Sequence, residues 1–122
     1  MVGIVGGYST EYRRHMSPGV RTQDLLAQAI VGVLKENGKN LSEVDGLGVS
    51  SFTLGPDQAI DLAWRLGLKL TWLAEDNHGG VGGANLLRSA KTAVQEEQAK
   101  NIVIVAGDHL PPRCVSAGGG KL

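Results

Sequence analysis

Short apolar runs alternate with amphipathic stretches along most of the chain, and this alternation strongly limits the folds open to it. The apolar runs are bounded by Gly, Asn, Asp or Ser, a pattern typical of strands. Between them, apolar residues recur at steps of three and four, as on one face of a helix. The sequence predicts strands at 2–5, 46–50, 68–74 and 101–106, and helices at about 22–37, 56–66 and 82–98.

This βαβαβαβ order predicts an α/β fold with a mainly parallel sheet and helices on both faces. The run 101–106 is almost wholly apolar, so we expect a strand buried on both faces. Thr22 is the expected N-cap of the first helix. At 122 residues the chain is long enough for one domain. We expect that domain to cover 1–110, followed by an irregular tail at 111–122 that lacks periodicity.

Composition excludes several classes of function. The formal net charge is zero, so the chain carries no electrostatic footprint for nucleic acid or acidic membranes. Aromatic residues make up 4%, too few for platforms that stack single-stranded bases. The single cysteine, Cys114, allows no internal disulfide. No apolar run approaches the length needed to span a bilayer, so a cytoplasmic protein is expected.

The most suggestive segment for function runs from Trp72 to Leu87. It leaves a predicted strand through polar residues, turns through four glycines in five positions, and enters a helix. Ligands bind beyond the carboxyl ends of strands in such sheets, and amides at a helix N-terminus can hold an oxyanion or phosphate. The glycines Gly79, Gly80, Gly82 and Gly83 are therefore candidate substrate contacts. Close packing of helix on strand, or positive φ angles, explains them equally well.

His78, directly before these glycines, is the best acid–base candidate in the chain. No Ser or Cys nucleophile stands beside it at the turn, and a structural histidine is the competing interpretation. A metal site formed by His78 with Asp76, Asp108 and His109 is an alternative by residue type. The spacing of these residues matches no zinc pattern, so no metal site is predicted. A small phosphate- or nucleotide-binding domain is a further alternative, although no Gly-Lys-Ser/Thr ending follows the glycines.

The chain resembles the N-terminal part of the thiolase superfamily, in particular the sterol-carrier or lipid-transfer type. The residues that carry the resemblance are spread from 2 to 108, and their order and spacing make it fairly specific. They are Val2-Gly-Ile-Val-Gly-Gly7 with Tyr12-Arg13, Leu34-Lys-Glu-Asn-Gly38, Val44-Asp-Gly-Leu-Gly48, Leu62-Ala-Trp-Arg-Leu-Gly67, His78-Gly-Gly-Val-Gly-Gly83 and Asn101-Ile-Val-Ile-Val-Ala-Gly-Asp108.

The resemblance implies a thiolase-like half-fold and a role in acyl-CoA or lipid metabolism. In the family a nucleophilic Cys begins the helix after the third strand. Aligning that motif puts Gly80 at the Cys position, with Gly79 as the alternative. A thiolase-like domain without thiolase activity of its own is therefore expected, with a coenzyme A thioester as ligand or substrate and no tightly bound cofactor. Any acyltransferase or lyase activity would need a further segment or partner.

The resemblance also implies how the chain assembles. In the family the third strand, here residues 68–76, and the helix after it form the dimer interface. We therefore expect a homodimer, or a partner chain bound, through 68–76. The alternative at this stage is a non-enzymatic module that uses the half-fold only to dimerise.

Overall fold

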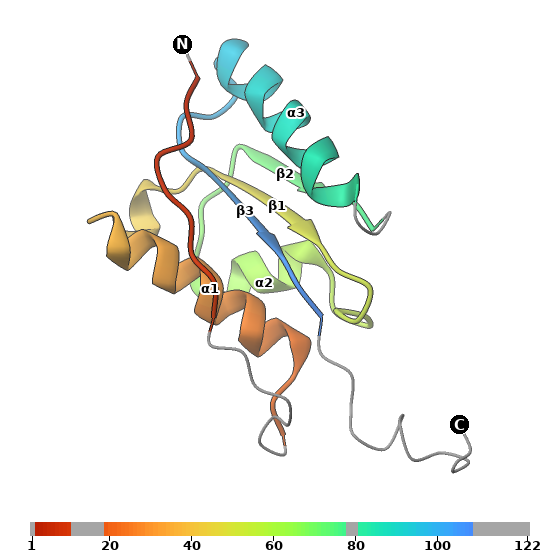
Figure 1. Cartoon of the computed structure of the whole chain (residues 1–122). Coiled ribbons are helices and arrows are strands. Elements are labelled where there is room, and N and C mark those ends of the chain that lie inside the picture. Colours follow the sequence, from red (N-terminus) through yellow and green to blue (C-terminus); the bar gives the residue numbers. More distant parts are fainter. Residues whose placement is uncertain (1, 11–18, 78–80, 109–122) are drawn as a thin grey trace.

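A computed structural model describes residues 2–10, 19–77 and 81–108, which form an α/β fold around one parallel sheet (Figure 1). The elements in chain order are α1 (Thr22–Glu36), the short 3-10 helix η1 (Leu41–Glu43), β1 (Gly46–Ser50), α2 (Ala59–Leu66), β2 (Trp72–Glu75), α3 (Gly82–Gln95) and β3 (Ile102–Ala106). The strand order is β2-β1-β3, with β1 parallel to both neighbours. The α/β class and the parallel sheet are confirmed for these residues.

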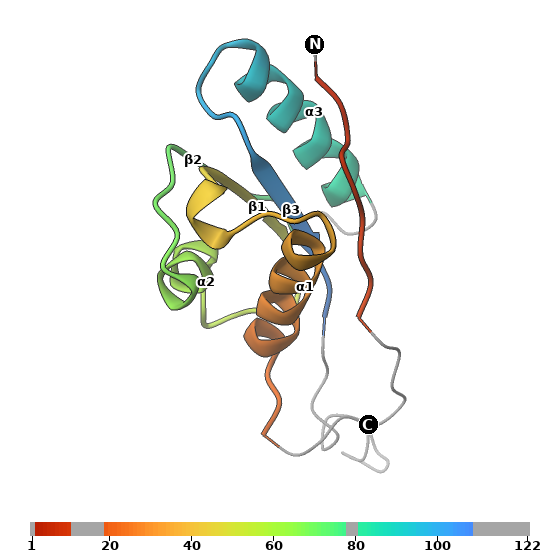
Figure 2. The same ribbon diagram turned by 90° about the vertical axis from the view of Figure 1, so that its left-hand side faces the viewer.

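The two faces of the sheet are covered by different helices because β1 alternates bulky and small residues. Leu47 and Val49 are completely buried in the core that α1 and α2 form on one face. Gly46 and Gly48 face the other side, where a Cβ at Gly48 would touch Leu86 of α3. The missing side chains let α3 lie close against the sheet. Figure 2 shows α3 on one side of the sheet and α1 and α2 on the other.

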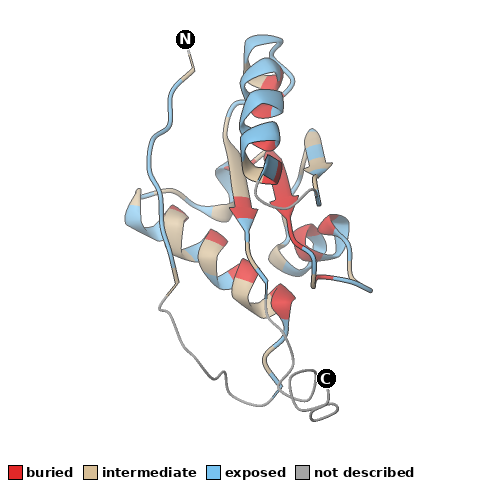
Figure 3. Ribbon diagram, turned by 45° about the vertical axis from the view of Figure 1, so that its right-hand side comes forward, coloured by how far each residue is buried: buried red, intermediate tan, exposed pale blue. Residues whose placement is uncertain are grey.

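The larger core lies between the sheet and the two helices α1 and α2. Leu26 and Ile30 of α1 and Leu62 of α2 are fully buried there. Buried residues line the inward faces of the helices and the central strand, and exposed residues line the outer faces (Figure 3). No helix among the described residues is long and apolar enough to cross a membrane.

The predicted first strand, 2–5, is wrong. Residues 2–10 form no strand, and Ile4 and Val5 are 81% and 74% exposed. The segment lies against α1 instead: Cβ atoms at Gly6 and Gly32 would overlap the side chains of Asn37 and Tyr8 respectively. An apolar run is buried as a strand only if it pairs in the sheet, and this segment pairs with none of the three strands.

Four further expectations need correction at the ends and edges of elements. Strand β2 begins at Trp72, four residues later than predicted, and α2 begins at Ala59 rather than at Pro56. Strand β3 is not buried on both faces: only Val105 is buried, and among the described residues β3 pairs with a strand on one side only. The N-cap of α1 is Arg21, not Thr22; the Asp24 carboxylate accepts the Arg21 N–H at 2.8 Å.

Candidate functional site

The carboxyl ends of the three parallel strands meet at one edge of the sheet, as the sequence predicts. Ser51 follows β1, Asp76 and Asn77 follow β2, and Asp108 follows β3 by two residues. Hydrogen bonds join these segments: the Ser51 N–H donates to Asn77 Oδ1 at 3.3 Å, and the Gly107 N–H donates to the Ser50 carbonyl at 3.2 Å. We call this edge the carboxyl rim.

Helix α3 begins at the rim, and its first residue is a glycine for a steric reason. A Cβ at Gly82 would collide with Ser50 Oγ and lie 2.9 Å from the Asp76 carbonyl oxygen. A Cβ at Gly83 would meet nothing within 4 Å. Neither glycine has a positive φ. Close packing therefore accounts for Gly82, whereas Gly83 faces open space. His78, Gly79 and Gly80 lie outside the described residues.

The partial positive charge at the N-terminus of α3 is not offset by side chains of its cap or first turn. The N-cap residue is Val81, which makes no side-chain cap, and the first turn carries no acidic residue. The first amides of a helix have no intrahelical acceptor and carry the positive end of the helix dipole. This end of α3 therefore suits an oxygen with partial or full negative charge.

Asp108 organises the rim. Its Oδ1 atom accepts hydrogen bonds from the Phe52 N–H at 2.6 Å, the Thr53 N–H at 2.9 Å, and the hydroxyls of Ser51 at 2.9 Å and Thr53 at 3.0 Å. Partial burial raises the pKa of Asp108, but these donors outweigh it and hold the pKa below its ordinary value. The carboxylate thus ties the loop after β1 to the end of β3. Thr53 continues this link to α1 through Thr22, with the two hydroxyl oxygens 2.7 Å apart.

Asp76 has a separate role at the rim. Its Oδ2 atom accepts a hydrogen bond from Asn85 of α3 at 2.9 Å. Within the described residues, no group of three or more His, Cys, Asp or Glu side chains could hold a metal ion. The metal alternative therefore gains no support from Asp76 and Asp108, and His78 and His109 lie outside those residues.

Two large apolar side chains stand exposed beside these polar groups. Phe52 is 68% exposed on the loop after β1, and Val81 is 57% exposed just before α3. Phe52 comes two residues after Ser50 and Val81 directly before Gly82, and Ser50 and Gly82 are in contact at the rim. The rim therefore combines a helix N-terminus that lacks a side-chain cap with apolar surface. This combination suits a ligand with a polar acyl head and an apolar chain.

The described part of the rim holds no pair of nucleophile and base. Ser51 is 7% exposed and its hydroxyl donates to Asp108, so it is engaged in structure. Sequence reasoning singled out Asp76 and Asp108 but missed Ser51, Thr53 and Phe52. The polar run 50–53 directly after a predicted strand was the signal that could have found them.

The chain has a thiolase-like fold, which matches part of the condensing enzymes of that superfamily. No known family model matches the sequence. It is 27% identical over 101 residues to beta-ketoacyl-[acyl-carrier-protein] synthase III of Clostridium perfringens (strain SM101), an alignment that covers 80% of this chain and 31% of that protein.

Solved structures agree with this assignment. The beta-ketoacyl-[acyl-carrier-protein] synthase III of Thermus thermophilus is similar with a TM-score of 0.67 and 27% identity, over 79% of this chain and 30% of that one. A variant of OleA from Xanthomonas campestris, solved with bound lauric acid and lauroyl-CoA, matches with a TM-score of 0.70 over 79% of this chain and 30% of its own. At 18% identity that likeness concerns the fold alone. The chain thus spans about 30% of the length of the proteins it matches.

Proposed function

We propose that this chain is a thiolase-like domain of acyl-CoA or lipid metabolism that binds an acyl thioester but performs no thiolysis alone. It contributes part of an acyl-CoA pocket and assembles through the strand region 68–76 with a second copy or a partner chain. The nucleophile and base come from a further segment or from that partner. The observation that most supports this proposal is the N-terminus of α3 at the rim, which has no side-chain cap and no acidic residue in its first turn. The fold is shared with a structure solved with lauroyl-CoA.

Two observations at the rim support a binding role. Gly83 leaves the space at the α3 N-terminus unobstructed, so a carbonyl oxygen can approach the first amides. Phe52 and Val81 offer apolar surface for an acyl chain. In the proposed site His78 is the acid–base residue, Gly79, Gly80, Gly82 and Gly83 are the substrate contacts, and Gly80 stands at the position of the family's nucleophile, which a glycine cannot replace chemically.

Calorimetric titration with acyl-CoAs of increasing chain length tests the binding role. Binding that strengthens with chain length is expected, since each buried CH₂ contributes about 0.8 kcal/mol. Gly83→Leu fills the open space at the α3 N-terminus and should abolish binding. Ala84→Leu places a leucine one residue later, at an exposed position of the helix, and should leave binding unchanged. Equal binding by wild type and Gly83→Leu would overturn the proposal.

A second assay tests the absence of thiolysis. The chain is incubated with acetoacetyl-CoA and free CoA, and no acetyl-CoA should form. Because Cys114 is the only thiol, the same assay is repeated with Cys114→Ala. Turnover that survives this substitution would contradict the proposal that the domain performs no thiolysis alone. A melting temperature raised by inorganic phosphate but not by acyl-CoA would favour the phosphate-binding alternative.

One observation favours the second candidate, a non-enzymatic assembly module. Among the described residues β2 pairs with a strand on one side only, and Trp64 of α2 is 81% exposed. Long apolar edges are normally covered, because they otherwise invite aggregation. A well-folded dimer that binds no acyl-CoA at any chain length would favour this module over the proposed acyl-CoA domain.

A further inference from the structure

The sequence contains a single Asn-Gly pair, and it stands where helix α1 ends. Asn37 is the C-cap of α1, and Gly38 follows it with a φ of +66°. In such a pair the backbone nitrogen of the glycine attacks the side-chain amide carbon of the asparagine, because glycine has no Cβ to hinder the approach. Ammonia leaves, and water then opens the succinimide ring to aspartate or isoaspartate. The pair is therefore a candidate site of spontaneous deamidation.

Both reacting groups are engaged in other hydrogen bonds in the folded chain. The Gly38 N–H donates to the Lys35 carbonyl at 3.3 Å, as is usual for the residue that follows a helix. The side-chain Nδ2 of Asn37 donates to the Val33 carbonyl at 2.8 Å. The glycine nitrogen must leave Lys35, and the side-chain amide must leave Val33, before the two can react. Deamidation therefore requires that the last turn of α1 opens.

The N-terminal segment 2–10 lies on this last turn. A Cβ at Gly6 would overlap the side-chain amide of Asn37, so the backbone of the segment is in close contact with the group that reacts. The Tyr8 ring lies equally close to Gly32, one turn further back on α1. While the segment is docked in this way, it resists the movement that the reaction requires.

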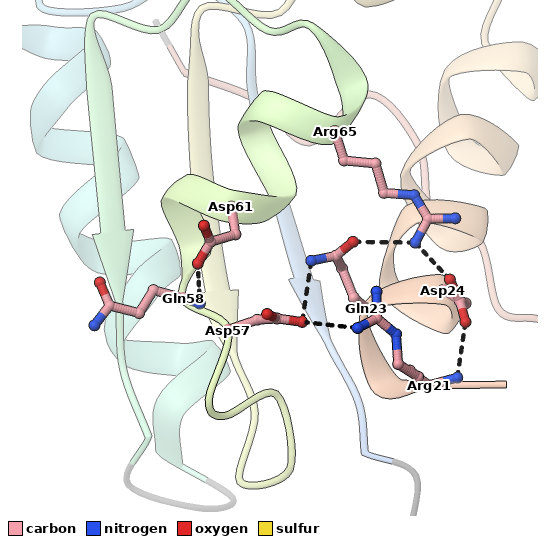
Figure 4. A network of polar contacts seen from close by, with 7 residues as sticks. All are labelled: Arg21, Gln23, Asp24, Asp57, Gln58, Asp61 and Arg65. Atoms are coloured by element: carbon pink, nitrogen blue, oxygen red, sulfur yellow. Dashed lines mark hydrogen bonds and ion pairs between the residues drawn. The ribbon is translucent and has the colours of Figure 1, made fainter. Parts of the chain in front are cut away.

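The other end of α1 is held by a network of polar contacts with α2. Arg65 Nη1 donates to Gln23 Oε1 at 3.2 Å and pairs with the Asp24 carboxylate, and Gln23 Nε2 donates to Asp57 Oδ2 at 3.2 Å (Figure 4). Local opening of a folded protein begins where such contacts are fewest. The C-terminal turn is therefore the end of α1 that opens first, and segment 2–10 is what covers it.

We propose that Asn37–Gly38 is a deamidation site whose rate is set by the docking of segment 2–10. The reaction replaces the Nδ2 donor by a carboxylate, which cannot donate to the Val33 carbonyl. The new negative charge lies at the C-terminal end of α1, where the helix dipole is also negative. Both changes weaken the surface on which the segment docks. Deamidation thus releases the segment in one direction only, independently of ligand binding at the rim.

Peptide mapping by mass spectrometry tests the site. The whole chain is incubated at physiological pH and temperature, with and without urea, and aspartate and isoaspartate at position 37 are quantified over time. Deamidation should be at least about 10-fold slower without urea, because the reaction follows the population of the open state. Asn85 and Asn101 are followed by Leu and Ile and serve as internal controls that should stay intact. Equal rates at position 37 with and without urea would overturn the proposal.

Two neighbouring glycines test whether docking sets the rate. Gly6→Ala should accelerate deamidation about 10-fold without urea, because the new methyl group overlaps Asn37 and displaces the segment. Gly7→Ala is the matched control: a Cβ there meets nothing within 4 Å, so its rate should equal that of wild type. In urea all three proteins should react at the same rate. If Gly6→Ala reacts no faster than Gly7→Ala, the segment does not control the site.

Limited chymotrypsin cleavage after Tyr8 tests the release of the segment. Asn37→Asp carries the product side chain and should raise the rate of this cleavage at least about 5-fold, because cleavage follows the population of the undocked segment. Asn40→Asp adds the same charge at an exposed position whose side chain makes no cap hydrogen bond, and should leave cleavage unchanged. Cleavage of Asn37→Asp at the wild-type rate would refute the release.

Discussion

Gly82 and Gly83 stand side by side at the start of α3, yet the structure predicts opposite effects when each becomes alanine. At Gly82 the new methyl group collides with Ser50 Oγ and crowds the Asp76 carbonyl. Overpacking of this kind costs about 1–3 kcal/mol. The helical preference of Ala over Gly offsets up to about 1 kcal/mol of that. Gly82→Ala should therefore lower the free energy of unfolding by about 1–2 kcal/mol.

Gly83→Ala has no steric cost, because its methyl group enters open space. It should stabilise the protein by about 0.5 kcal/mol, since alanine restricts the unfolded chain. For a domain of this size, about 4 °C of melting temperature corresponds to 1 kcal/mol. Gly82→Ala should therefore melt about 4–8 °C below wild type and Gly83→Ala about 2 °C above it.

Urea unfolding followed by the fluorescence of Trp64 and Trp72 measures both variants. The midpoints should move in opposite directions with an unchanged m-value. Ser50→Ala should rescue part of the loss in Gly82→Ala, because it removes the oxygen that lies nearest the new methyl group. If Gly82→Ala proves as stable as Gly83→Ala, the close-packing explanation of Gly82 is refuted.

Three further predictions concern polar contacts. Asp108→Asn should lower the free energy of unfolding by about 1 kcal/mol at pH 7. Folding lowers the pKa of Asp108, so the difference between wild type and variant is fully present above the ordinary pKa of the carboxyl. Urea unfolding at decreasing pH should show that this difference vanishes as the pH falls through the folded pKa. Asp45→Ala removes the acceptor of the Lys100 and Asn101 amides before β3 and should cost about 1–2 kcal/mol by thermal unfolding. Arg65→Met should cost under about 1 kcal/mol in urea, because its partner is partly exposed; a loss above 2 would contradict this.

Periodicity was sufficient to place most elements. Strand β1 was predicted at its observed bounds, and the helices at 22–36 and 82–95 were found with errors only at their ends. These elements have strong local signals: three- and four-residue apolar steps, and glycine or asparagine at the stops. The sequence by itself also determined the parallel order and the edge where the strand-end loops gather, because connection rules leave few alternatives.

Only the tertiary structure decided which apolar runs are buried and which polar residues work together. The run at 2–5 reads like a strand, but burial depends on a neighbour in the sheet, and none pairs with it. Nothing in the sequence near Asp108 indicates a partner for its carboxylate, yet it accepts hydrogen bonds from the loop 51–53, more than fifty residues away. The sequence pattern around Gly82 indicates an anion-binding turn, and the tertiary structure adds that Ser50 and Asp76 leave no room for a side chain at this position. Such contacts join residues remote in sequence, and no local pattern records them.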